Sequence, residues 1–266
     1  MISGMFDADF RMQDIDKNGD PLVALNEAVD WEIFRPQLKV IRQKKRKSTA
    51  GRKPFDVVLM FKILVLQSLY NLSDDATEFQ IQDRLSFMRF LGLGLDSRIP
   101  DSKTIWLFRE DLTKHGLVEK LFEQFDAYLW EQGFRAEKGQ IVDASIIAAP
   151  RQRNTREENR KIKEGDTPAD WPENKRRQKD TDARWTKKNG ATHYGYKNHI
   201  SIDVKYKFVR SYDVTAASVH DSQVFDDLLD PLNSSADVWA DSAYRSKEKI
   251  QLLQQMNYSP HLQRKA

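Results

Sequence analysis

Two aspartates interrupt apolar segments that otherwise have the composition of buried strands. Asp143 lies within residues 141–144, and Asp241 ends residues 238–241. An unpaired carboxylate in the middle of a sheet is costly, so each side chain needs a hydrogen-bonding partner or a metal ion. If the two strands are neighbours, the carboxylates converge and can hold a hard divalent cation. The alternative is structural: Asp143 accepts from nearby backbone, and Asp241 opens a turn before Ser242.

Histidines are the other side chains that suggest chemistry. His193 and His199 share one face of an expected strand, but they lie six residues, or about 20 Å, apart along it. They are therefore too distant to chelate one ion. His220 and Asp221 are more typical of the start of a helix than of a catalytic pair.

Positive charge is concentrated in two segments. Residues 42–53 contain seven Lys or Arg and no acid, and residues 151–188 contain thirteen Lys or Arg against eight Asp or Glu. Such clusters indicate a polyanion such as DNA, although a solvated linker has the same composition. Trp171 and Trp185 lie in the second segment, where they either stack on bases or anchor a loop. The candidate DNA contacts are Arg42, Lys44, Lys45, Arg46, Lys47, Arg52, Lys53, Arg176, Arg177, Lys187, Lys188 and Lys197.

Length and composition limit the class of protein. The chain has 266 residues, 39% of them hydrophobic and 31% charged, which fits one large or two modest globular domains. Its longest apolar stretch, residues 57–66, contains Lys62 and is far shorter than the ~20 residues that span a bilayer. No secretory signal is visible, and the absence of cysteine excludes disulfides and thiolate metal sites. A cytoplasmic protein is expected.

The N-terminal half should be helical. Residues 1–53 form a weakly patterned segment that ends in the basic run, and residues 54–136 form a helical domain for DNA binding or assembly. Its central helix begins at Pro54 and is apolar nearly all round, while Ser73, Asp101 or Ser102 are N-caps and Gly92 is a C-terminal stop. The expected helices cover residues 22–34, 55–70, 73–85, 87–91, 102–115 and 117–132.

The hydrophobic period changes to that of strands near residue 139. Residues 137–266 are expected to form a mixed α/β domain, with a basic insert at 151–190 that has almost no aliphatic residues and should be irregular or mobile. Strands are expected at 139–149, 193–205, 208–215 and 237–240, helices at 220–229 and 246–256, and the start of a strand after Tyr258. The second strand alternates, with Tyr194, Ile200 and Ile202 on one face and His199, Ser201 and Asp203 on the other.

Several stretches, in order, resemble one family. The helical half carries YNLSD at 70–74, RLSFMRFLG at 84–92 and PDSKTI at 100–105, and the second half carries VDASIIAAP at 142–150, HYGYKNHI at 193–200, TAASVHDS at 215–222 and ADSAY at 240–244. In these motifs the chain resembles bacterial insertion-sequence transposases of the IS5 type, within the group that uses an Asp-Asp-Glu (DDE) acidic triad. The likeness covers roughly residues 50–262.

The resemblance implies a fold, a reaction and a site. The fold is an RNase H-like mixed sheet whose first and fourth strands lie side by side, with Asp143 and Asp241 as the first two acids of the triad. Those acids would bind two Mg²⁺ or Mn²⁺ ions, one activating a water or 3′-hydroxyl and the other stabilising the departing oxygen. The protein would cut element ends and join them to target DNA. Terminal inverted repeats, target DNA and further copies in a synaptic complex, at the bacterial nucleoid, are the implied partners.

The third acid of the family is absent from these residues. In the family it is a Glu within the pattern Tyr, two residues, Arg, three residues, Glu, six residues, Lys, and no such pattern occurs. Glu248 is only seven residues past Asp241. We therefore expect a C-terminally truncated transposase, with a sheet incomplete at that end and impaired catalysis. A non-catalytic DNA-binding fragment that occupies element ends or inhibits intact transposase is the alternative. A nuclease unrelated to transposition would require two aspartates to suffice.

Overall fold

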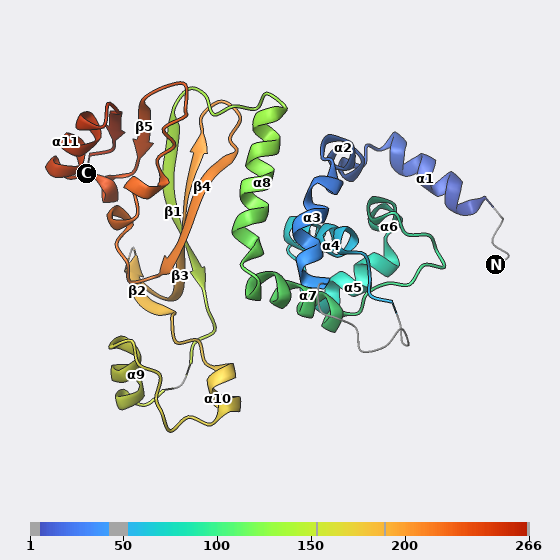
Figure 1. Cartoon of the computed structure of the whole chain (residues 1–266), viewed down its shortest axis with the longest axis horizontal. Coiled ribbons are helices and arrows are strands. Elements are labelled where there is room, and N and C mark those ends of the chain that lie inside the picture. Colours follow the sequence, from blue (N-terminus) through green and yellow to red (C-terminus); the bar gives the residue numbers. More distant parts are fainter. Residues whose placement is uncertain (1–5, 43–52, 153, 189, 265–266) are drawn as a thin grey trace. The chain divides into compact units, whose positions relative to one another are not determined.

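The chain folds into two compact units, which meet in sequence at residues 128 and 129 (Figure 1). The structure is a computed structural model that describes residues 6–42, 53–152, 154–188 and 190–264. The first unit is helical, and the second contains a mixed sheet with short helices. This agrees with the expected α/β chain with a helical N-terminal half.

Unit 1 contains more helix near its N-terminus than the sequence pattern indicated. A single helix over 22–34 was expected, but α1 precedes it and the expected segment divides between α2 and η1. Asp20 and Asp30 each accept a backbone N–H at a helix start, so the two side chains begin separate helices. The elements are α1 (Asp7–Lys17), α2 (Pro21–Ala28), η1 (Trp31–Phe34), α3 (Arg35–Leu38), η2 (Lys39–Arg42), α4 (Val57–Tyr70), α5 (Asp74–Asp83), α6 (Leu85–Leu91), α7 (Ser102–Lys114) and α8 (Leu117–Glu131).

Helix α4 is central to unit 1, as its apolar sequence predicts. Its buried side chains include Met60, Ile63 and Leu66, and they belong to the main helical core. The expected start at Pro54 is wrong: Asp56 accepts the N–H groups of Val58 and Leu59 as the N-cap, so the helix begins at Val57, three residues later. Among the described residues no single helix is long and apolar enough to cross a membrane; only α4 and α5 together reach that length, with a bend of 102° between them.

Three further predicted helix ends are confirmed, whereas the expected break between residues 85 and 87 is wrong, because α5 ends at Asp83 and α6 begins at Leu85. Ser73 accepts from the Ala76 N–H to start α5, and Asp101 accepts from the Thr104 N–H to start α7. Gly92 ends α6 in the left-handed conformation. Local capping chemistry therefore defines these boundaries.

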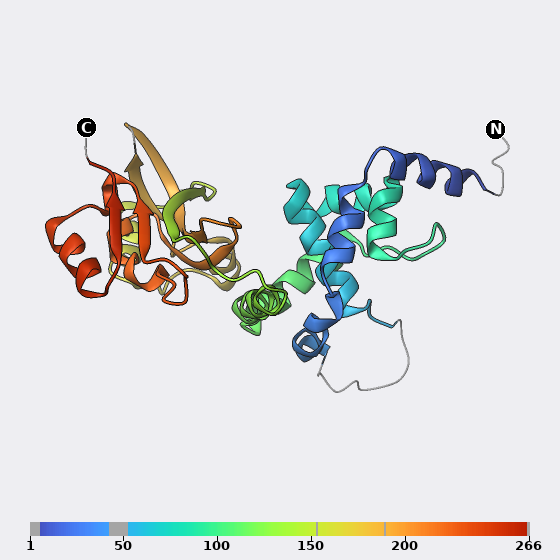
Figure 2. The ribbon, with the colours of Figure 1, turned by 90° about the horizontal axis from the view of Figure 1, so that it is seen from above.

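Unit 2 is built on one six-stranded sheet (Figure 2). Strand β1 pairs antiparallel with β3 on one side and parallel with β5 on the other, and β6 continues in parallel beyond β5. Strands β2 and β4 pair with β3. The strands are β1 (Gln140–Ala148), β2 (Arg184–Lys188), β3 (Ala191–Asp203), β4 (Val209–Ala216), β5 (Asp237–Ala240) and β6 (Ser259–Leu262); the helices are α9 (Arg156–Lys163), α10 (Glu173–Gln178), η3 (Asp221–Gln223), η4 (Asp226–Leu228), η5 (Ser242–Tyr244) and α11 (Lys247–Gln255).

The expected helix at residues 220–229 is two single 3-10 turns, η3 and η4. The apolar positions of that segment are buried as a helical period requires, and they include Phe225 and Leu228. The backbone is already extended at Leu229, and Pro231 follows Asp230. Because a residue before proline is disfavoured in helical conformation, the segment cannot continue as a helix there.

The polar face of β3, not its apolar face, packs against the core of unit 2. His199 and Ser201 are fully buried, and they lie opposite Ala144 and Val142 of β1. Side chains of directly opposed residues share one face of a sheet, so these groups point toward the buried cluster that includes Val142, Val238 and Phe225. We call this side the core face.

The basic insert is folded, contrary to the expectation of an irregular segment. Thr155 and Glu158 form a capping box at the start of α9, and Ile162 and Trp171 are buried. The Glu158 carboxylate accepts from the Trp171 indole N–H and the Lys175 ammonium, each at 2.7 Å. One tryptophan and a hydrogen-bonded carboxylate thus replace the aliphatic core that the composition lacks.

Candidate active site at the β1–β5 boundary

Asp143 projects from the middle of β1 and is exposed. Strand alternation places it on the face opposite the buried Val142 and Ala144, in register with Ile200 of β3. One of its oxygens, Oδ1, accepts the N–H of Ala144 at 2.7 Å. The backbone therefore orients this carboxylate, as the structural alternative proposes, while the side chain faces away from the core.

Asp241 comes directly after the last residue of β5 and is the N-cap of η5. Its Oδ1 accepts the Ala243 N–H at 2.8 Å, which is the turn-opening role that the sequence allowed. Both aspartates are thus held in place by short local hydrogen bonds.

The parallel pairing of β1 and β5 brings the two aspartates into adjacent positions. Val142 lies opposite Ala240 in this register; Asp143 is the next residue on β1, and Asp241 is the first residue after β5. Strand alternation places the Asp143 carboxylate on the face opposite the core face. The predicted pairing of the two strand segments is confirmed. The two aspartates lie at the carboxyl end of β5.

A buried tyrosine lies close to these carboxylates. Tyr244 is 1% exposed, and its hydroxyl has no hydrogen-bond partner among the described residues. Burial raises the pKa of this phenol, and the negative charges of Asp221, Asp143 and Asp241 raise it further. Tyr244 was not predicted as a site residue, although it ends the ADSAY motif that carries the family likeness.

Asp221, which the sequence places at the start of a helix, also lies near the candidate site. It lies at the start of η3, and its carboxylate is 2.7 Å from the Lys197 ammonium, which also donates to the Val219 carbonyl. Both side chains of the pair are largely buried, and η3 contacts η5, the turn that Asp241 caps. Lys197, predicted as a DNA contact, is therefore engaged in an internal ion pair beside the candidate site.

The neighbouring histidine, His199, is buried. His199 accepts or donates at Nε2 with the Thr215 hydroxyl, at 2.9 Å. Burial lowers the pKa of this imidazole, an effect that Asp221 opposes. His199 supports the core face of the sheet, and its distance from His193 along β3 excludes a shared ion, as expected.

The two aspartates are the kind of ligand that a hard divalent cation prefers, but they are only two ligands. Asp143 and Asp241 offer carboxylate oxygens, which Mg²⁺ and Mn²⁺ prefer. Within the described ranges, no group of three or more His, Cys, Asp or Glu side chains is arranged to hold a metal ion. The two aspartates thus fit a metal as an incomplete ligand set.

The predicted DNA contacts lie in several environments. Lys44, Lys45, Arg46, Lys47 and Arg52 fall outside the described residues, while Arg42 donates to the Phe55 carbonyl and Lys53 is exposed. Of the predicted contacts on the insert and β2, all four are exposed: Arg176, Arg177, Lys187 and Lys188.

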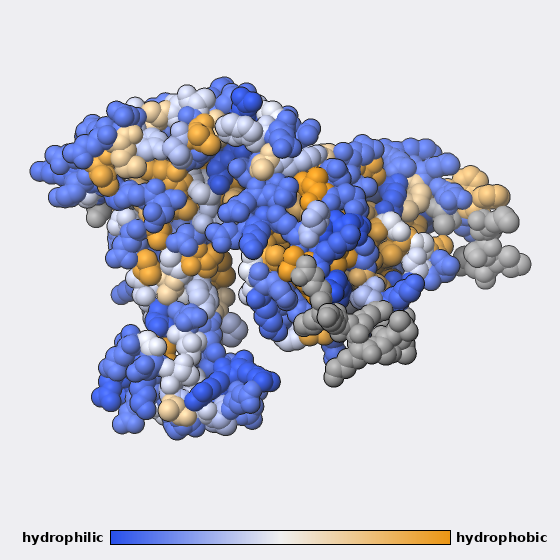
Figure 3. Space-filling model, viewed as in Figure 1, coloured by the Kyte–Doolittle hydropathy of each residue, from blue (hydrophilic) through white to orange (hydrophobic). Residues whose placement is uncertain are grey.

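The insert also holds the two tryptophans considered for base stacking. The surface of the α9–α10 module, at the lower left of Figure 3, is mostly hydrophilic. Trp171 is buried and anchors that module, which confirms the structural alternative for this residue. Trp185 on β2 is 50% exposed and contacts the Tyr194 ring.

Two family models match the chain in succession. Residues 10–111 match a transposase domain (DUF772), and residues 135–265 match the transposase DDE domain. Among solved structures, a piggyBac transposase synaptic complex with hairpin DNA, determined by cryo-EM, is similar to 87% of this chain with a TM-score of 0.40 and 14% identity. The chain spans 49% of that transposase chain, about half its length.

These matches cover most of both units. The chain is therefore built from two successive transposase domains.

Proposed function

We propose that this protein is a DNA transposase of the IS5 type that cuts the ends of an insertion element and joins them to target DNA. The observation that carries this proposal is the parallel pairing of β1 with β5, which sets Asp143 beside Asp241 within the segment matching the DDE domain. The protein would act on terminal inverted repeats as a homo-oligomer in the bacterial cytoplasm, at the nucleoid.

The strand order supports an RNase H-like catalytic fold. Strands β1, β3 and β4 form an antiparallel set, and β5 and β6 extend the sheet in parallel from β1. In the family that the sequence resembles, the first strand and the later parallel strand carry the first two acids. We assign Asp143 and Asp241 to those positions.

We assign Asp143 and Asp241 as ligands to Mg²⁺ or Mn²⁺, in a site that holds two ions in the intact family. Bound there, the metal would supply Lewis-acid stabilisation of the attacking and departing oxygens of a phosphodiester. The backbone N–H groups of Ala144 and Ala243 fix one oxygen of each carboxylate and so limit the rotation of the ligands. The Lys197–Asp221 pair holds η3 against β3, and η3 in turn contacts η5, the turn that Asp241 caps.

Within residues 1–266 we assign two acids of the triad, Asp143 and Asp241. We infer that a chain of these residues alone cuts DNA weakly or not at all, because two ligands bind a metal less firmly than three. The alternative function is a DNA-binding fragment that occupies element ends or inhibits intact transposase. The basic run at 42–53 and the folded basic insert favour DNA retention under either function.

Cleavage of a labelled terminal-repeat duplex in Mg²⁺ or Mn²⁺ tests the proposal. We expect slow nicking that Asp143→Asn or Asp241→Asn reduces at least about a hundredfold, as loss of a metal ligand does. Asp237→Asn is the matched control, since Asp237 is a carboxylate on β5 that pairs with His261 instead of facing the site.

Three outcomes separate the two functions. Nicking that depends on both aspartates supports the enzyme, whereas tight DNA retention without nicking supports the fragment. Nicking unchanged in Asp143→Asn contradicts the site assignment. Calorimetric titration with Mn²⁺ gives a second measurement, because the heat of binding should disappear in Asp143→Asn and persist in Asp237→Asn.

A further inference from the structure

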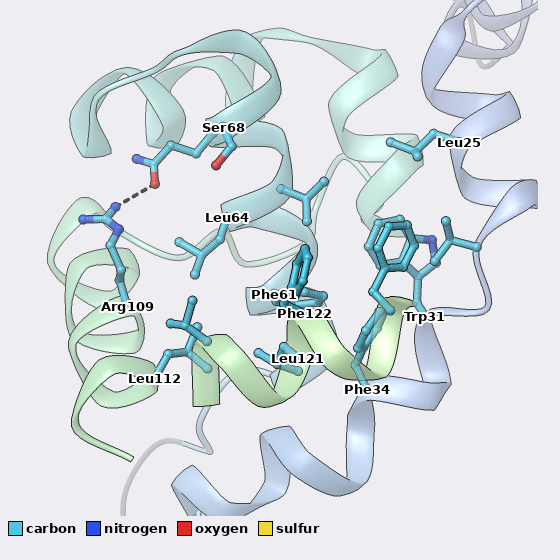
Figure 4. A pocket seen from close by; sticks show the side chains of 15 residues that line it. Leu25, Trp31, Phe34, Phe61, Leu64, Ser68, Arg109, Leu112, Leu121 and Phe122 are labelled. Atoms are coloured by element: carbon cyan, nitrogen blue, oxygen red, sulfur yellow. Dashed lines mark hydrogen bonds between the residues drawn. The ribbon is translucent and has the colours of Figure 1, made fainter. Parts of the chain in front are cut away.

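Unit 1 contains an apolar groove that the catalytic proposal does not use (Figure 4). It is a cavity of about 450 Å³ between α4 and the start of α8, closed at one end by the α2–η1 segment. Its walls are aromatic and aliphatic, and Val118 on its rim is 52% exposed. The lining includes Leu25, Trp31, Phe34, Phe61, Leu64 and Phe122. An opening of this size and character accommodates large apolar side chains.

Unit 1 also exposes two aromatic side chains, which are apolar like the lining of the groove. Helix α1 extends away from the rest of unit 1 in both views (Figures 1 and 2). Phe6 and Phe10 at its start are 59% and 62% exposed, and they lie one turn apart on the same side. Met12 and Ile15 lie on the opposite side and are half-buried. The helix thus attaches to its own unit by one face and presents an aromatic pair on the other.

The attachment of α1 to its own unit is specific. It contacts α6, and Asp16 forms an ion pair with Arg89, which also binds Asp20 at 2.7 Å. These contacts use the end of α1 that is distant from Phe6 and Phe10. The aromatic pair therefore remains displayed while α1 is docked on its own chain.

We propose that Phe6 and Phe10 of one copy insert into the groove of a second copy. Exposed aromatic residues on a soluble protein favour a partner surface, and the groove supplies an apolar one on the identical chain.

Reciprocal insertion of this kind gives a closed dimer. If each copy gives its α1 to the groove of the other, two identical contacts form around a twofold axis and a dimer results. The surface would assemble copies before DNA binds, and its existence does not depend on the catalytic assignment.

The oligomeric state of the full chain over a concentration series, measured by sedimentation velocity, tests the surface. We expect a reversible wild-type dimer, and a dissociation constant raised at least about tenfold by Phe6→Ser with Phe10→Ser, since two buried aromatic contacts are lost. Val118→Asp, on the groove rim, should have a similar effect. Phe79→Ser is the matched control, because Phe79 on α5 is equally exposed, at 61%, but belongs to neither surface.

Mixing the two kinds of variant gives a sharper result. A chain with serines at both positions retains its groove, and a chain with Val118→Asp retains its aromatic pair, so their heterodimer keeps one contact. We expect the mixture to dimerise more tightly than either variant alone. The chain has no cysteine, so Phe10→Cys on one copy and Val118→Cys on another should be joined by a short bis-maleimide, and Phe79→Cys should not.

Several results would overturn the proposal. A wild-type chain that is monomeric at every concentration has no such surface. A dimer whose dissociation constant is unchanged by the serine substitutions is held together elsewhere. Equal cross-linking from positions 10 and 79 would indicate random collision. None of these measurements involves DNA or metal, so their failure is distinguishable from failure of the transposase assignment.

Discussion

At the scale of single residues, the most buried charged group of unit 2 is a carboxylate that alternates with apolar side chains on β3. Asp203 is fully buried and forms an ion pair with Arg210 at 3.1 Å. It also accepts the N–H groups of Tyr206 and Phe208, which close the turn between β3 and β4. Removing one member of such a pair leaves an uncompensated buried charge.

We therefore expect Asp203→Ala to lower the free energy of unfolding by about 3–5 kcal/mol. Lys205→Ala is the control, because the Lys205–Glu137 pair nearby is partly exposed, and it should cost no more than about 1 kcal/mol. Urea denaturation followed by circular dichroism measures both. Equal effects of the two substitutions would mean that the buried pair contributes no more than a surface one.

The sequence predicted which residues of β3 share a face but not which face is buried. Alternation separates His199, Ser201 and Asp203 from Ile200 and Ile202, yet polarity suggests that the isoleucines face the core. The structure has the reverse arrangement because each polar group finds a specific partner: Thr215 for His199, Gln140 for Ser201 and Arg210 for Asp203. These partners lie on the neighbouring strands β1 and β4, so the pattern within β3 alone cannot reveal them.

The same limit applies to the candidate site. Asp143 and Asp241 stand out locally because each interrupts or ends an apolar strand, and the pairing of those strands is confirmed. Tyr244 and Asp221 gain their positions beside the aspartates only from the packing of η5 and η3, which no local spacing encodes.

At the scale of elements, the basic insert depends on one carboxylate. The Lys175 ammonium, the Thr155 backbone N–H and the Trp171 indole N–H all hydrogen-bond to Glu158 and lower its pKa to about 2, from an ordinary value of 4.5. A lowered pKa means that the folded module favours the ionised form. Its contribution to the stability of the module is then complete above the pKa of the unfolded chain and is lost as the pH falls from about 4.5 toward 2.

We expect the indole N–H resonance of Trp171 to keep its folded chemical shift down to about pH 4 and to change below it, with a midpoint near that lowered pKa. Glu158→Gln removes the ionisation, so in that variant the resonance should shift already at neutral pH and show little acid dependence. Trp171→Phe assigns the signal. A wild-type midpoint near 4.5 would show that the hydrogen bonds to Glu158 contribute nothing to the module.

At the scale of the whole molecule, the charge distribution indicates where a polyanion binds. The net charge is only +3, but the basic residues of 42–53 and 151–188 exceed the acids there by seven and five, so the rest of the chain is acidic overall. Because an acidic surface repels phosphates, DNA affinity should depend on these two segments and not on total charge.

We expect alanine at Lys44, Lys45, Arg46 and Lys47 to weaken DNA binding and to reduce the slope of log K against log salt concentration by up to about 3.5, since each phosphate contact contributes about 0.9. Alanine at Lys17, Lys103, Lys114 and Lys120 changes the net charge equally but removes cations from outside the two segments, and should leave the slope nearly unchanged. Filter binding over a salt series measures both. Equal loss of slope in the two variants would mean that DNA responds to net charge alone, and an unchanged slope in the first would exclude the basic run as a contact.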